Sequence, residues 1–165
     1  MKLEIKDRLI LSNQFKILEQ LYPEEKEYFS QNRKAIEEGY ELHYAWMTQG
    51  FNDPLPVDEC IYVLNVLQMF EEIYKSFKLI GKSDKIAEKR VIFPGFDGNG
   101  EAAYMTYTSY IVDDLQRFDT IRKIKNGYYN SHTPMVGKYK DMLSKKNGYK
   151  FPYNENQLLS LLIDL

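Results

Sequence analysis

The chain has 165 residues, 44% of them hydrophobic, and a formal net charge of -2. This composition is typical of one soluble globular domain and excludes a disordered or strongly nucleic-acid-coating protein. The single cysteine, Cys60, excludes an internal disulfide, and the N-terminal stretch MKLEIKDRL lacks the apolar core of a secretory signal. Apolar runs such as LLI at 161–163 are too short for a membrane helix. We therefore expect a cytoplasmic protein without membrane spans.

The first third of the chain predicts three helices. Apolar residues recur at spacings of two to four over residues 3–21, and this pattern predicts a helix that ends near Pro23. Pro23 and the early acids of PEEKEYFSQNRKAIEEGY open a second helix, which Gly39 ends. Residues 40–56 begin aromatic and end in two prolines, so we expect a short helix and then a loop.

The strongest helix signal spans residues 57–80, between Pro56 and Gly81. Its apolar seam has alternating spacings of three and four: Cys60, Val63, Leu67, Phe70, Tyr74 and Phe77. Further apolar residues widen the seam round the helix, which is typical of a central, buried position or a subunit interface. We expect this helix to be the spine of the domain.

Helix signals also dominate the second half of the chain. After a short extended segment, RVIFPGF at 90–96, a helix is expected over residues 99–118 and a loop around Gly127. Thr133 and Pro134 precede another helix that stops near Gly148. Asn154, with Gln157 three residues later, predicts a capped final helix. The sequence thus predicts an all-α fold, a single compact domain of about six helices over 1–165, with no sheet.

The stretch FPGFDGNGEAAY at 93–104 looks most like a binding loop, with four candidate residues: Gly95, Asp97, Asn99 and Glu101. Neither register of a calcium loop provides both the required acids and the required glycine. The glycines precede a helix, as in phosphate loops, but two acids would repel an anion. The alternative is that Asp97 or Asn99 caps the helix and Glu101 lies in its first turn.

Few other residues indicate catalysis. Cys60 lies on the apolar seam, which favours a buried, inert thiol, and the only histidines are His43 and His132. No HExxH, CxxC or ExxH pattern occurs, so a metal centre is poorly supported and we expect no cofactor. Adjacent carboxylates such as Glu71 and Glu72 point about 100 degrees apart on a helix, as on a solvated face.

Positive charge is concentrated between residues 117 and 150, a segment that contains nine Lys or Arg and only two acids. These cations could bind a nucleic-acid backbone while the interleaved tyrosines stack on its bases. Alternatively, they could bind the acidic surface of another subunit. An ordinary solvated surface is the third interpretation. The candidate basic face comprises Arg117, Arg122, Lys123, Lys125, Tyr128, Lys138, Lys140, Lys145 and Lys146.

Several blocks in this order resemble the YfbU family of bacterial proteins: RLILSNQF at 8–15, IEEGY at 36–40, residues 59–77, RVIFPGFD at 90–97 with Glu101 and Tyr104, and HTPMVGKYKDML at 132–143. The resemblance implies a mostly helical, single-domain bacterial cytosolic protein and assigns no catalytic residue. Residues 119–130 and the tail after Lys145 match the family least.

These observations favour a non-enzymatic regulatory or interaction module that forms homo-oligomers through aromatic and apolar helix faces. Nucleic-acid binding through residues 117–150 is the first alternative. A hydrolase with a carboxylate or phosphate site in the 95–101 loop is the second, and it requires a pocket into which Asp97 or Glu101 points.

Overall fold

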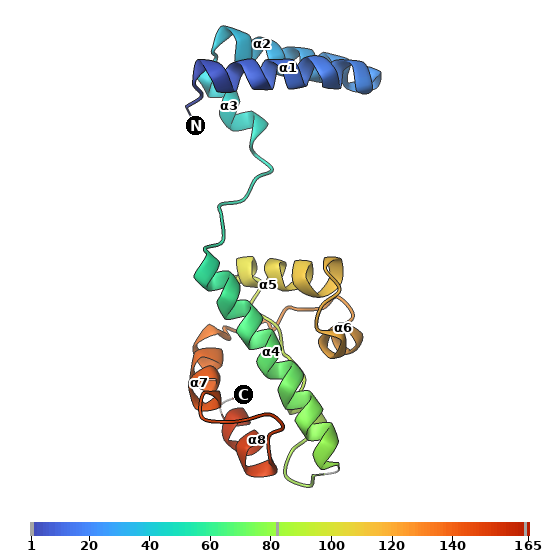
Figure 1. Ribbon diagram of the computed structural model, residues 1–165, viewed down its shortest axis with the longest axis vertical. Helices are drawn as coiled ribbons and strands as arrows, with labels where there is room; N and C mark the ends of the chain where they lie inside the picture. Colours follow the sequence, from blue (N-terminus) through green and yellow to red (C-terminus); the bar gives the residue numbers. More distant parts are fainter. Residues whose placement is uncertain (1, 82, 164) are drawn as a thin grey trace. The chain divides into compact units, whose positions relative to one another are not determined.

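The computed structural model describes residues 2–81, 83–163 and 165, and in these ranges the chain forms eight α-helices and no strand (Figure 1). The chain folds as two compact units, Met1–Pro54 and Leu55–Leu165. The all-α prediction is confirmed. The predicted number of helices, about six, is too low.

The first unit is a helical hairpin with a third helix. Helix α1, Ile5–Leu21, and helix α2, Lys26–Glu38, lie side by side, joined by a 3-10 turn at Pro23–Glu25 (Figure 1). Gly39 ends α2 with a left-handed φ of 76°, as the sequence predicts. Helix α3, Glu41–Met47, packs against α2.

The second unit is built round helix α4, Val57–Ile80, whose bounds are the predicted ones. Four shorter helices contact it: α5, Ala102–Ser109; α6, Asp119–Lys125; α7, Val136–Lys146; and α8, Glu155–Leu162. In Figure 1, α5 and α6 lie on one side of α4, and α7 and α8 lie on the other. The predicted central position of α4 is therefore confirmed for the second unit.

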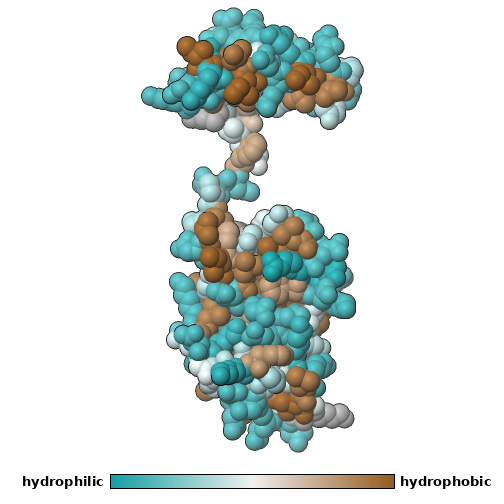
Figure 2. Space-filling view, in the orientation of Figure 1, coloured by the Kyte–Doolittle hydropathy of each residue, from teal (hydrophilic) through white to brown (hydrophobic). Residues whose placement is uncertain are grey.

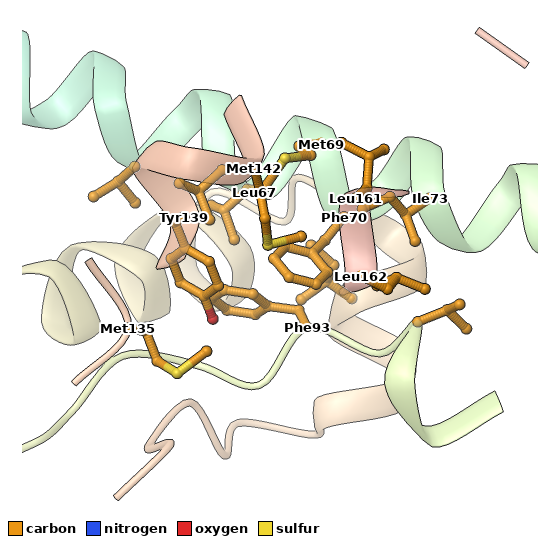
Figure 3. Packing of buried hydrophobic residues seen from close by; sticks show 14 of the residues in the cluster. Leu67, Met69, Phe70, Ile73, Phe93, Met135, Tyr139, Met142, Leu161 and Leu162 are labelled. Atoms are coloured by element: carbon orange, nitrogen blue, oxygen red, sulfur yellow. The ribbon is translucent and has the colours of Figure 1, made fainter. Parts of the chain in front are cut away.

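One core fills the second unit. Phe70 of α4 packs against Phe93 and Tyr139, with ring centroids 5.3 and 5.4 Å apart (Figure 3). Met142 of α7 and Leu161 of α8 close the same core from the other helices. The predicted seam of α4 lies on this side, although Cys60 and Tyr74 are half-buried rather than buried.

The helix predicted over 99–118 is shorter and irregular. It begins at Ala102, and a π-helical turn at Tyr110–Asp114 follows it. The turn changes the register of the residues after it, and Leu115 is 48% exposed. Gln116 and Phe118 then adopt left-handed backbone conformations, which end the helix before α6 begins.

Candidate functional site

The 93–101 loop is held against residues 129–131. The N–H of Phe96 donates to the carbonyl of Tyr129 at 2.9 Å, and the N–H of Ser131 donates to the carbonyl of Phe96 at 3.0 Å. The hydroxyl of Tyr139 donates to the carbonyl of Gly95 at 2.7 Å. Gly95 has a φ of +112°, and a Cβ there would collide with the carbonyl oxygen of Tyr129. Only glycine therefore fits this approach of two backbones.

Asp97 closes the tight turn that precedes α5. Its buried carboxylate accepts hydrogen bonds from the N–H groups of Asn99 at 3.2 Å and Gly100 at 3.1 Å. The predicted cap of the helix itself is wrong, because α5 starts at Ala102 and neither Asp97 nor the exposed Asn99 is its N-cap. Asp97 acts one turn earlier, as aspartates do in Asx-turns.

Glu101 is buried and accepts three backbone hydrogen bonds. One oxygen, Oε1, accepts from the N–H groups of Met135 and Val136, each at 2.8 Å. The other, Oε2, accepts from the N–H of Asp97 at 3.0 Å. Met135 is the N-cap of α7 and has no side-chain cap of its own. A carboxylate from a distant segment therefore satisfies the first free N–H groups of α7, where the helix dipole favours negative charge.

A second buried glutamate, Glu71 of α4, does the same for α6. Its carboxylate accepts from the hydroxyl of Thr120 at 2.6 Å and from the N–H of Ile121 at 3.4 Å. Lys75, one turn along α4, pairs with it at 3.0 Å. The sequence placed Glu71 among the carboxylates of a solvated face, and its burial at 5% exposure corrects that interpretation. Glu71 and Glu101 both hold helix starts.

The basic residues on α6 are largely engaged within the chain. Arg122 pairs with Asp119 at 2.6 Å. The Lys125 ammonium donates to the carbonyl of Pro94 at 3.0 Å and lies 5.5 Å from the ring centre of Tyr128, and burial lowers the pKa of this lysine. Tyr128 and Lys123 are exposed.

The other basic residues lie on α7, apart from Arg117, whose guanidinium lies over the ring of Phe118. Lys146 pairs with Glu72 at 2.9 Å, Lys138 and Lys140 are exposed, and Lys145 is half-buried. Figure 1 shows α6 and α7 on different sides of α4, so these cations form two groups. Nucleic-acid binding through residues 117–150 stays a prediction.

The chain's histidines and its cysteine lie in separate surroundings. His43 packs edge-on against Trp46, His132 contacts the hydroxyl of Tyr128, and the thiol of Cys60 lies 3.6 Å from the carbonyl of Leu55. Within the described ranges, no three His, Cys, Asp or Glu residues are grouped as metal ligands. The helices of the same ranges include none long and apolar enough to cross a membrane.

An aromatic cleft between α2 and α3 was not predicted from the sequence. The cleft has a volume of 420 Å³, and its walls are Tyr28, Gln31, Asn32, Lys34, Ala35, Tyr40, His43, Trp46 and Met47. Tyr40, His43 and Trp46 are spaced three residues apart, which places three rings along one side of α3 and its N-cap. This spacing is the sequence signal from which the cleft could have been predicted.

The fold and these sites define an all-α protein in which Asp97 and Glu101, the carboxylates of the 93–101 loop, accept hydrogen bonds from backbone N–H groups. The chain belongs to the YfbU family, since the YfbU domain matches residues 1–160 and so spans both units. It is similar to UPF0304 protein MJECS11 of Methanocaldococcus jannaschii, with 32% identity over 163 residues, covering 94% of this chain and 96% of that protein. That relative is archaeal, so the bacterial source implied by the resemblance stays a prediction, as does a single domain over 1–165.

Proposed function

We propose that the protein is a non-enzymatic interaction module that self-associates through an apolar stripe on α1. The α1 stripe consists of Ile10, Leu11, Ile17, Leu18 and Leu21. Three of these residues, Ile10, Ile17 and Leu21, are 57–65% exposed. Figure 2 shows hydrophobic side chains gathered on the face of the first unit that carries α1. Such an exposed group of large aliphatic side chains is typical of an interaction surface.

The first unit buries little apolar surface of its own. Among its described residues, 2–54, the buried hydrophobic ones are Ala35, Ile36 and Tyr44. A unit of this size needs more burial than that to offset its conformational entropy. Covering the α1 stripe would supply the missing hydrophobic stabilisation at about 25 cal/mol per Å².

Polar pairs occupy much of the contact between α1 and α2. Arg33 of α2 bonds to Glu19 at 2.7 Å and to Glu37 at 3.1 Å, and the hydroxyl of Ser12 donates to Glu37 at 2.7 Å. Arg8 of α1 reaches the carbonyl of Ile36 at 2.7 Å. The polar residues of α1 in these pairs therefore lie on the side that faces α2, whereas Ile10, Ile17 and Leu21 of the stripe are exposed on other sides of the helix.

The geometry of the stripe suits a second copy of the same helix. Ile10 and Ile17 are seven residues apart, as are Leu11 and Leu18, which is the repeat by which helices pair along their length. Asn13 and Gln14, beside the stripe, are uncharged, so two copies would meet without like-charge repulsion there. A two-fold pair is the commonest closed arrangement of identical subunits.

Light scattering and sedimentation velocity test the proposal at tens of micromolar protein. We expect the wild type to be a dimer or a larger oligomer, and Ile17→Glu to be a monomer. Gln20→Glu adds the same charge to an exposed position of α1 outside the stripe, and it should behave as the wild type does. A monomeric wild type would contradict the proposal, as would equal association of the two variants.

A further inference from the structure

The aromatic cleft between α2 and α3 offers uncovered ring faces. Tyr28 on α2 and Trp46 on α3 are 57% and 55% exposed. His43 meets Trp46 edge-on at 90°, with ring centroids 4.5 Å apart, which fixes the indole from one side. At 420 Å³ the cleft lies in the size range of small-molecule sites. A planar ring is the ligand shape that such faces stack best.

A buried donor lines the same cleft. The side-chain Nδ2 of Asn32 is buried and has no hydrogen-bond partner among the described residues. Leaving a buried amide donor unpaired costs free energy, so nearly all such groups in folded proteins have a partner. A rotation of the Asn32 side chain that brings this donor to the surface of the cleft would let an acceptor atom of a ligand provide one.

The charge of the residues that line the cleft indicates the charge of the ligand. Lys34 is on the wall, and the described lining includes no carboxylate. An aromatic cage for an ammonium group would be opposed by this lysine. An anionic group near Lys34 is favoured instead.

We propose that this cleft binds a purine nucleotide, either free or as an unstacked residue of a single strand. The base stacks on Trp46 and Tyr28, a ring nitrogen of the base accepts from Asn32, and the phosphate lies by Lys34. Asparagine suits adenine in particular, because its amide can pair with the N6 and N7 edge. This site is separate from the α1 stripe and does not depend on self-association.

Fluorescence of Trp46, the only tryptophan in the chain, reports on the cleft directly. The probes are AMP, adenosine and a short oligoadenylate, added to the full-length protein. We expect saturable quenching by AMP and weaker binding of adenosine, which lacks the phosphate. Asn32→Leu should weaken AMP binding about five- to tenfold, the usual effect of one neutral hydrogen bond. Lys34→Gln should bring the affinity for AMP down to that for adenosine.

Lys26→Gln is the matched control, since Lys26 lies on α2 outside the cleft, and it should bind AMP as the wild type does. Tighter binding of the oligoadenylate than of AMP would identify a strand as the source, and equal binding would identify the free nucleotide. The proposal is overturned if none of the three probes gives a saturable change, or if Lys34→Gln, a surface change, leaves AMP binding intact. It is also overturned if the Trp46 signal follows protein concentration alone, since a second copy would then fill the cleft.

Discussion

Glu101 accepts a hydrogen bond from the backbone N–H of Met135 at 2.8 Å across 34 residues of sequence. The contact joins the loop before α5 to the start of α7, and the same oxygen also accepts from Val136. Because Met135 has no capping side chain, the start of α7 depends on this distant carboxylate. The loop that resembles a ligand site is thus a structural junction.

Glu101→Gln should lower the free energy of unfolding by about 2 kcal/mol, because the amide nitrogen cannot accept the bonds that one carboxylate oxygen now accepts. Urea unfolding followed by circular dichroism measures the change. Asp114→Asn is the control, since Asp114 is exposed at the end of the π-helical turn, and it should change stability by less than about 0.5 kcal/mol. Equal stability of the two variants would show that Glu101 does not stabilise the start of α7.

Gly95→Ala should destabilise the protein by at least about 2 kcal/mol, since the new Cβ would meet the Tyr129 backbone and the φ of +112° suits only glycine. Gly137→Ala is the matched comparison. Gly137 lies in α7 with no atom within 4 Å of an added Cβ, so alanine there should stabilise the helix by up to about 1 kcal/mol. Thermal unfolding of both variants gives the comparison, and a tolerated alanine at 95 would contradict the close approach.

The sequence predicts what depends on local signals. Helix α4 is bounded by Pro56 and Gly81, and the capping box of Asn154 and Gln157 at α8 is confirmed, with N–H bonds of 2.9 and 3.0 Å in the two directions. Both are decided by residues within a few positions of each other.

Thr133 and Pro134 predict a helix start close to that of α7, but the residues that cap α6 and α7 could not be predicted in the same way. Their caps are Glu71 and Glu101, which come from 49 and 34 residues away. No spacing rule relates such residues before the chain is folded. The π-helical turn at Tyr110–Asp114 also leaves no signal in hydrophobic periodicity, so the sequence predicts one helix over 99–118 whereas α5 ends at Ser109.

Thr120→Val should lower the free energy of unfolding by about 1 kcal/mol, because it removes the 2.6 Å bond to the buried carboxylate of Glu71 while keeping the side-chain shape. Thr106→Val is the control, since the hydroxyl of Thr106 bonds only to a carbonyl of its own helix at an exposed position. Hydrogen exchange of the α6 amides should rise in the first variant alone. Unchanged exchange there would show that Glu71 does not hold the start of α6.

The hairpin of the first unit should respond to acid through Glu37. The hydrogen bond from Ser12 holds the pKa of Glu37 below its ordinary value of 4.5, and Arg33 adds to this effect, although partial burial opposes it. With a lower pKa in the folded state, the unfolded chain binds more protons near and below pH 4.5. The stability contributed by Glu37 is therefore complete above that pH and is lost as the pH falls through the folded pKa.

In an NMR titration, Ser12→Ala should raise the pKa of Glu37, whereas Ser30→Ala, on the same hairpin, should leave it unchanged. An unaltered titration of Glu37 in Ser12→Ala would assign the shift to Arg33 instead.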